Sequence, residues 1–149
     1  MSGAEWSVRT LLSPVITRLI TYGVHPIEIE RVVAGIESTP LRGPTDLETR
    51  WLEAWQALAD CWDARAAKAL SSGHRTTASL MATNATGCHL AMFLINSRDL
   101  SRKREIYESY ARSYRKAAEC FDAPARVVAI PFERDRRMSA VLHLPANMT

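Results

Sequence analysis

Residues 126–145 read RVVAIPFERDRRMSAVLHLP, and they break the helical pattern of the chain that precedes them. Two apolar runs flank the charged residues 133–137, which predicts two strands joined by a tight turn. In the first run, at 127–132, both alternating sets of residues are apolar, and a strand of that kind needs cover on both faces. Pro131 removes one ladder hydrogen bond, as is typical of an edge strand. Because an isolated hairpin is marginal in water, we expect it to be the edge of a larger sheet that this sequence does not encode.

Three long helices are predicted before the hairpin. Residues 46–71 repeat Trp and Leu at helical spacing, residues 75–95 are apolar on most sides, and a third helix begins near 101 and closes near 122. The apolar segment 75–95 should therefore be central. Because the connections are short, neighbouring helices should be antiparallel. The third helix carries a stripe that we expect to face a neighbour, formed by Tyr107, Tyr110, Tyr114, Ala118 and Phe121.

Two shorter helices are predicted nearer the N-terminus. The first covers residues 5–21, beginning with Trp6 in its apolar face, and is perturbed or restarted at Ser13–Pro14. The second opens at His25–Pro26, and a loop at 38–46 separates it from the first long helix, for which Thr45 or Asp46 is the expected cap. Its apolar face contains Ile29, Val32, Val33 and Ile36.

The predicted fold is therefore mainly α: an antiparallel bundle of about five helices followed by a C-terminal β-hairpin. We expect three regions, with short helices at 1–40, a three-helix bundle at 41–123 and the hairpin at 124–149.

Composition excludes several classes of protein. With 149 residues, of which 47% are hydrophobic and 23% charged, the chain has the make-up of one soluble globular domain. A net charge of +3 is too small and too dispersed to indicate a nucleic-acid partner. We find no apolar run of the roughly 20 residues that cross a bilayer and no signal peptide. We therefore expect no membrane partner and a cytoplasmic location.

Neither cysteines nor histidines suggest a cofactor. Three cysteines, Cys61, Cys88 and Cys120, are odd in number and stand inside apolar helical patterns, so buried reduced thiols are expected. No two histidines have the spacing that would place two ligands on one helix face. We therefore predict no metal site and no cofactor.

Three segments resemble the FrsA-like alpha/beta hydrolases, the group that includes 2,6-dihydroxypseudooxynicotine hydrolase. The first cap helix and its turn are similar to Trp55, Leu58, Ala59 and residues 64–78 (ARAAKALSSGHRTTA) of this chain, and the second cap helix is similar to residues 84–94 (NATGCHLAMFL). Residues 107–133 (YESYARSYRKAAECFDAPARVVAIPFE) are similar to its third helix and first sheet strand. Relatives carry aromatic residues where Gly87 and Cys88 stand here. The resemblance covers about two thirds of the chain, residues 46–145.

The resemblance implies a helical cap over an active site, dimer contacts, and a hairpin that is the antiparallel edge of a hydrolase sheet. It also implies a nucleophile elbow, but no serine of this chain stands in a G-x-S-x-G motif. We therefore expect no catalytic residue here. The cap would instead line a pocket for a small apolar substrate, and the candidate lining residues are Trp55, Cys88, His89, Met92 and Phe93.

The residues themselves allow plainer interpretations. Cys88 and His89 are adjacent on a helix and point about 100 degrees apart, so they do not form a dyad. A core helix with one hydrogen-bonded histidine is the simpler reading of this segment, and packing is the simpler reading of the tryptophans and tyrosines. Glu28 and Glu30, two apart on a helix, should both face solvent.

We therefore expect a cap segment of a serine hydrolase acting on esters or carbon–carbon bonds. Its catalytic domain would be supplied by the same polypeptide or by a separate chain, in a homo- or hetero-oligomer. The alternatives are a free-standing helical binding or scaffold protein, which kept a cap and has no catalytic part, and a small cyclase that uses the cap cavity.

Overall fold

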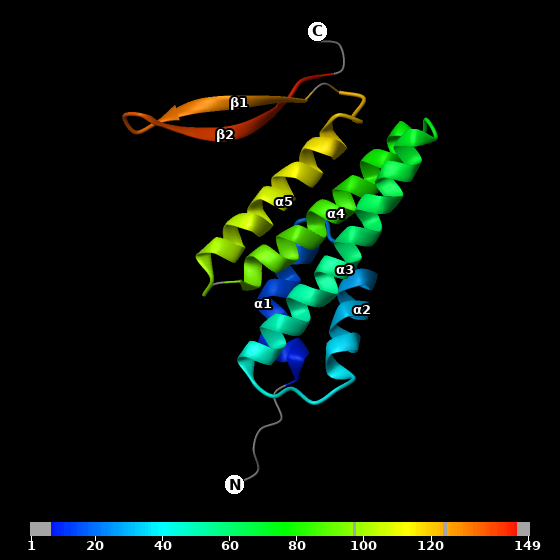
Figure 1. The fold of residues 1–149 in the computed structure, drawn as a ribbon, viewed down its shortest axis with the longest axis vertical. Coiled ribbons are helices and arrows are strands. Elements are labelled where there is room, and N and C mark those ends of the chain that lie inside the picture. Colours follow the sequence, from blue (N-terminus) through cyan, green and yellow to red (C-terminus); the bar gives the residue numbers. More distant parts are fainter. Residues whose placement is uncertain (1–6, 97, 124, 146–149) are drawn as a thin grey trace.

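The computed structural model describes residues 7–96, 98–123 and 125–145, and it consists of five helices followed by an antiparallel hairpin (Figure 1). This confirms the predicted mainly helical fold with its C-terminal hairpin. The elements are α1 (Val8–Thr21), α2 (Pro26–Glu37), α3 (Pro44–Ser71), α4 (Arg75–Ile95), α5 (Leu100–Ala118), β1 (Ala125–Phe132) and β2 (Arg136–His143).

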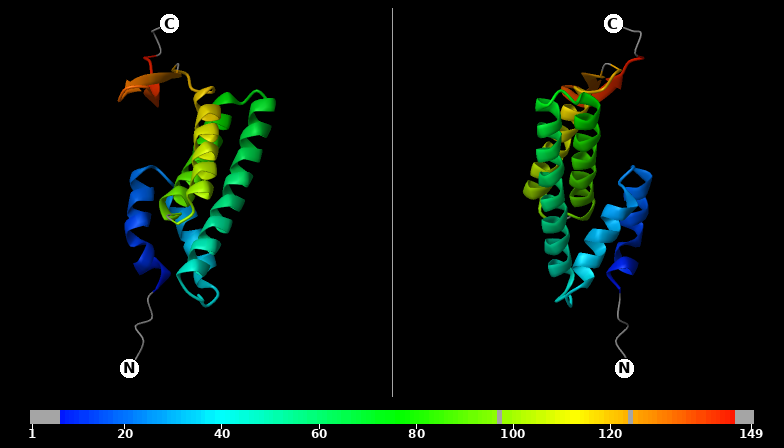
Figure 2. Two further views of the ribbon diagram at one scale, coloured as in Figure 1. Left: turned by 60° about the vertical axis from the view of Figure 1, so that its left-hand side comes forward. Right: turned by 90° about the vertical axis from the view of Figure 1, so that its right-hand side faces the viewer.

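Helix α4 is the centre of the bundle, as its sequence predicts. It packs between α3 and α5, and α1 also contacts it (Figures 1 and 2). Small residues on α4 allow its neighbours to pack closely, because the short side chain of a buried alanine leaves little space between two helices. The buried side chains of α4 include Ala78, Ala82, Ala85, Cys88 and Ala91.

Two tryptophans of α3 anchor the main core. Trp51 and Trp55 are completely buried, and their ring centroids lie 5.5 Å apart. The indole Nε1 of Trp51 donates to the carbonyl of Ala91 at 2.9 Å, which satisfies the polar atom of a buried ring. Leu19 of α1 and Ile29 of α2 belong to the same core, so the two short helices cover the end of the bundle where the tryptophans lie.

The starts of α2 and α3 follow different rules. His25 caps α2 through Nδ1, which accepts from the N–H of Ile27 at 3.2 Å, and Pro26 stands in the first turn as predicted. Helix α3 begins at Pro44, earlier than the expected caps Thr45 and Asp46. Its N-cap is a glycine with φ of 144°, and Asp46 lies inside the first turn, where it accepts from the N–H of Arg42 at 2.9 Å.

Helix α1 is continuous through Pro14, so the predicted restart at that residue does not occur. The hydroxyl of Thr17 donates to the carbonyl of Ser13 at 3.0 Å beside the proline. Residues 5 and 6 of the expected helix, including Trp6, lie outside the described residues.

Helix α5 is shorter than expected, and the face that it buries against the bundle is not the predicted tyrosine stripe. Asp99 caps it by accepting from the N–H of Arg102 at 2.9 Å, and the helix ends at Ala118 rather than near 122. Its buried residues are Ile106, Ser113 and Ala117. The predicted tyrosine stripe is therefore not the core face: it lies beside it, and Tyr107 is half exposed.

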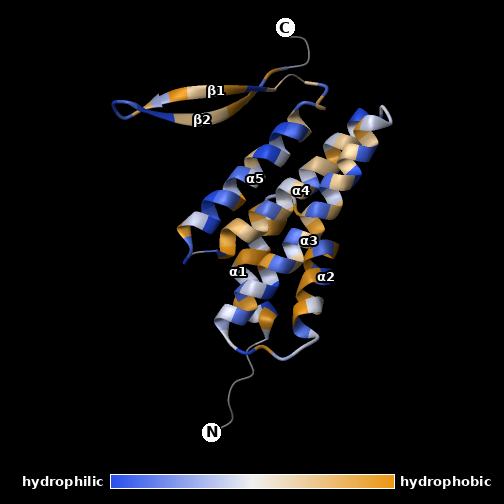
Figure 3. Cartoon of the chain, in the orientation of Figure 1, coloured by the Kyte–Doolittle hydropathy of each residue, from blue (hydrophilic) through white to orange (hydrophobic). Residues whose placement is uncertain are grey.

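The hairpin projects from the end of α5 with both faces largely open to solvent (Figure 1). Its strands pair from Ala125↔His143 to Phe132↔Arg136. His143 links the hairpin to the bundle: its ring lies 5.6 Å from that of Phe121 and 6.2 Å from that of Tyr114, measured between centroids, and its Nε2 lies 2.6 Å from the hydroxyl of Tyr114. Hydrophobic residues alternate with hydrophilic ones along both strands (Figure 3), and several of the hydrophobic side chains are exposed, among them Val127, Ile130 and Met138.

Within the described part of the chain, α4 alone is long and apolar enough to cross a membrane by length and composition, which corrects the expectation that no segment approaches that length. Half of its most apolar stretch is buried inside the protein. A core helix of a soluble protein has the same length and apolar composition. Like such a helix, α4 is packed against α1, α3 and α5.

Candidate functional site

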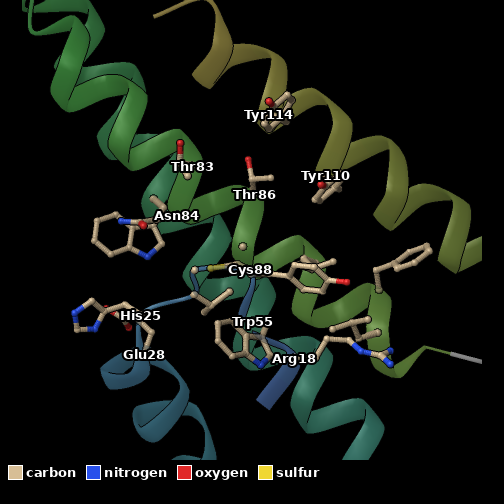
Figure 4. A pocket seen from close by; sticks show the side chains of 18 of the residues that line it. Arg18, His25, Glu28, Trp55, Thr83, Asn84, Thr86, Cys88, Tyr110 and Tyr114 are labelled. Atoms are coloured by element: carbon tan, nitrogen blue, oxygen red, sulfur yellow. The ribbon is translucent and has the colours of Figure 1, made fainter. Parts of the chain in front are cut away.

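A cavity of about 790 Å³ opens between the α1–α2 turn, α3, α4 and α5 (Figure 4). A volume of this size suits a small organic molecule. The residues that line it are Arg18, Tyr22, Gly23, Val24, His25, Ile27, Glu28, Trp55, Trp62, Leu80, Thr83, Asn84, Thr86, Gly87, Cys88, Leu90, Phe93, Leu94, Tyr110 and Tyr114.

Two glycines bring the α1–α2 turn against α4. Gly23 has φ of 84°, a left-handed conformation that glycine adopts without steric cost. Gly87 lies on α4 opposite the turn, and a Cβ placed on it would come within 3.0 Å of Cγ2 of Val24. The wall of the cavity therefore depends on the absence of a side chain at Gly87.

Aromatic rings form much of the cavity wall. Phe93 of α4 and Tyr110 of α5 line the cavity, and each lies 6.2 Å from Tyr107, measured between ring centroids. Burial raises the pKa of Tyr110, and the neighbouring tyrosines raise it further, so its hydroxyl stays protonated near neutral pH. Tyr110 can thus present a neutral hydroxyl to a bound molecule.

The cavity has two charged residues, and they differ in their partners. Glu28 has a side chain only 14% exposed and pairs with Arg31 at 3.2 Å. The prediction that Glu28 faces solvent is therefore wrong, whereas Glu30 is exposed and pairs with Arg9. Arg18 has no ion pair with any described residue.

Three of the five predicted pocket residues line the cavity: Trp55, Cys88 and Phe93. Met92 is completely buried in the core, and His89 is buried on another side of α4. Burial raises the pKa of the Cys88 thiol to about 12, so it is an unreactive wall group at neutral pH. Whether the cavity binds a substrate stays a prediction.

His89 belongs to a separate polar cluster between α3, α4 and α5. Its Nδ1 is buried and has no hydrogen-bond partner among the described residues, so the expected hydrogen bond of a core histidine is not found there. Asp63 lies in the same region, where it accepts from the hydroxyl of Ser113 at 3.4 Å and pairs with Lys116 at 3.5 Å. Burial lowers the pKa of His89, although Asp63 and Asp60 act in the opposite direction.

This cluster does not have the geometry of a catalytic triad. Ser113 donates to the carboxylate of Asp63, whereas a serine nucleophile donates to an imidazole that the carboxylate orients. Within the described residues, no three metal-binding side chains are grouped together. Neither Ser113, by its geometry, nor Cys88, by its raised pKa, is an activated nucleophile.

Sequence reasoning missed Arg18, Glu28 and the α1–α2 turn. One signal was available for Glu28: it stands four residues before Val32, which places it beside the apolar stripe of α2. No comparable signal identified Arg18, because residues far apart in sequence create the cavity beside it.

Comparison with known proteins gives one partial similarity. No family model matches the chain. The protein named Hydrolase ORFZ from Pyricularia oryzae is 36% identical over 101 residues, which cover 64% of this chain and 24% of that protein. The chain thus spans about a quarter of the length of this curated relative. The similarity relates the chain to a protein named as a hydrolase.

Proposed function

We propose that the chain is the helical cap of a serine alpha/beta hydrolase of the FrsA-like type, and that its cavity is the substrate pocket. The nucleophile lies outside this chain, in a catalytic domain that belongs to the same or a separate polypeptide. The reaction of the whole enzyme is ester or carbon–carbon bond hydrolysis by acyl transfer to serine. The protein works in the cytoplasm as a homo- or hetero-oligomer.

The observation that carries this proposal is the contact between the cavity wall and the hairpin. Tyr114 lines the cavity, and its hydroxyl is 2.6 Å from Nε2 of His143 in β2. The hairpin also extends over the side of the bundle where α1 lies (Figure 2). Strands added to this hairpin would therefore stand beside the cavity, where a nucleophile could reach a bound molecule. The partial similarity to a hydrolase supports the same assignment.

The cap would contribute binding and exclusion of water. Apolar and aromatic walls favour an apolar substrate by burying its surface, at about 25 cal/mol per Å². Closing the pocket over the reacting bond strengthens every electrostatic interaction inside it. None of these contributions requires a catalytic group from this chain.

The test uses the whole polypeptide or complex that contains this cap. A G-x-S-x-G followed by Asp and His should be encoded next to this segment or in a neighbouring reading frame, and esterase activity is then measured on p-nitrophenyl esters. Thr83→Trp places an indole at the cavity edge of α4 and should raise KM at least fivefold. Thr77→Trp, on the same helix, exposed and outside the cavity, is the matched control and should not.

Two outcomes would reject the proposal. One is the lack of any such motif in or beside the gene, which would favour the free-standing binding or scaffold protein. The other is equal activity of the Thr83→Trp and Thr77→Trp variants, because a cavity that binds substrate cannot tolerate an added indole at its edge.

A further inference from the structure

We infer that the cavity is built for an aromatic molecule with an anionic group at one end, and that Arg18 pairs with that group. This rests on the proposed function, because it names the substrate class of the same pocket. The inference comes from the charges of the lining residues and from the arrangement of polar groups along the cavity.

The two charged residues of the cavity differ in whether they have a partner. Arg18 and Glu28 are its two charged lining residues apart from histidine. The carboxylate of Glu28 has a partner in Arg31, at 3.2 Å. Since Arg18 pairs with no described acid, its guanidinium is the charged lining group that is left to pair with a ligand.

Trp55 lies at the same end of the cavity as Arg18 (Figure 4). Its Nε1 is completely covered by the protein and has no hydrogen-bond partner among the described residues. A molecule in the cavity can therefore reach the guanidinium of Arg18 but not this indole donor.

The end of the cavity opposite Arg18 is lined by neutral side chains. Tyr110, Tyr114, Thr83 and Thr86 lie there (Figure 4). The threonine hydroxyls are used within α4, where Thr83 donates to Ser79 and Thr86 donates to Ala82. Tyr114 joins this end to the hairpin. The anion would thus be held at the end away from the hairpin, and the reacting bond would lie toward the added sheet.

The test measures binding of three probes to the intact chain by tryptophan fluorescence and calorimetry. The probes are 2-naphthoate, 2-naphthylmethanol and 2-naphthylmethylamine, which share one ring system and differ in charge. Because Arg18 is exposed at the cavity edge, the anion should bind only about two- to fivefold more tightly than the alcohol, the range of a solvent-exposed ion pair. The amine should bind most weakly.

Arg18→Gln should abolish the preference for the anion and leave the affinity for the alcohol unchanged. Arg102→Gln is the control, because Arg102 is an exposed arginine outside the cavity. Its variant should keep the preference, and circular dichroism should show both variants folded.

The outcomes separate this inference from the proposed function. If the three probes bind equally, if the amine binds most tightly, or if Arg18→Gln keeps the preference, the anionic substrate class is rejected while the pocket stands. If none of the probes binds, the cavity is not a ligand site, and the proposed pocket is rejected with it.

Discussion

His89 shows how a single buried residue ties the stability of the bundle to pH. The charged groups around it oppose one another: Asp60 and Asp63 on α3 favour the protonated ring, and Arg112 and Lys116 on α5 disfavour it. Burial is the largest effect and lowers the pKa of His89 below its ordinary value of 6.5. The folded protein therefore takes up this proton at a lower pH than the unfolded chain does.

The lowered pKa of His89 in the folded protein leads to a prediction about stability. Below pH 6.5 the unfolded chain binds a proton that folded His89 does not, so the free energy of unfolding should fall as the pH falls from 7 to 5. One residue contributes a slope of at most about 1.4 kcal/mol per pH unit. Urea unfolding at several pH values should show this slope reduced in His89→Leu. The same slope in the variant and the wild type would contradict the assignment.

At the scale of elements, Gly87 determines how the α1–α2 turn meets α4. Alanine is favoured over glycine inside a helix by up to about 1 kcal/mol. Gly35 on α2 has open space where its Cβ would stand, so Gly35→Ala should show this gain. At Gly87 the added Cβ meets Val24 at 3.0 Å, so Gly87→Ala should gain less or lose stability.

A double variant isolates the contact. Val24→Ala removes the Cγ2 atom that a Cβ at Gly87 would meet. Gly87→Ala should therefore be more favourable in the Val24→Ala background than in the wild type, by about 0.5 kcal/mol or more in urea unfolding, the size of coupling expected for residues in contact. Additive effects of the two substitutions would show that Gly87 has no role in seating the turn.

The elements were largely predictable and the cavity was not. Repeating apolar spacing identified α3 and α4 to within a few residues, because the hydrophobic period fixes the helix and its buried face. The ends that were missed depend on local backbone: α3 starts after Gly43 with Pro44 in its first turn, and α5 gives way to i→i+3 turns at Cys120 and Phe121. Periodicity reports which face of a helix is buried but not which other helix covers it.

Only some of the candidate site residues line the cavity, because helical periodicity does not tell which elements meet around it. Trp55, Cys88 and Phe93, named as pocket candidates through a resemblance to cap helices, line the cavity, and their role toward a substrate stays a prediction. His89 is one residue from Cys88 and points elsewhere, as the 100° step of a helix requires. Arg18 comes from α1, and only the docking of the α1–α2 turn brings it to the cavity.

At the scale of the whole molecule, the hairpin is the least covered part of the described chain. Five of its apolar side chains are 43–61% exposed: Val127, Ile130, Phe132, Met138 and Leu142. Ile130 and Met138 stand opposite each other in the register and share one face. Monomeric soluble proteins rarely expose apolar surface of this kind together with two open strand edges.

The chain on its own should therefore associate through the hairpin. Light scattering after size exclusion is expected to show a dimer or larger species, because pairing covers apolar faces and strand edges that water now contacts. The variant Ile130→Lys/Met138→Lys places two charges on one face and should shift the chain toward the monomer without changing its helix content. Leu100→Lys is the control: it removes a side chain that is 77% exposed at the start of α5, away from the hairpin, and should leave the association unchanged. A wild-type chain that remains a monomer at high concentration would mean that the hairpin needs no covering partner. The supposition that it is the edge of a larger sheet would then lose its physical basis.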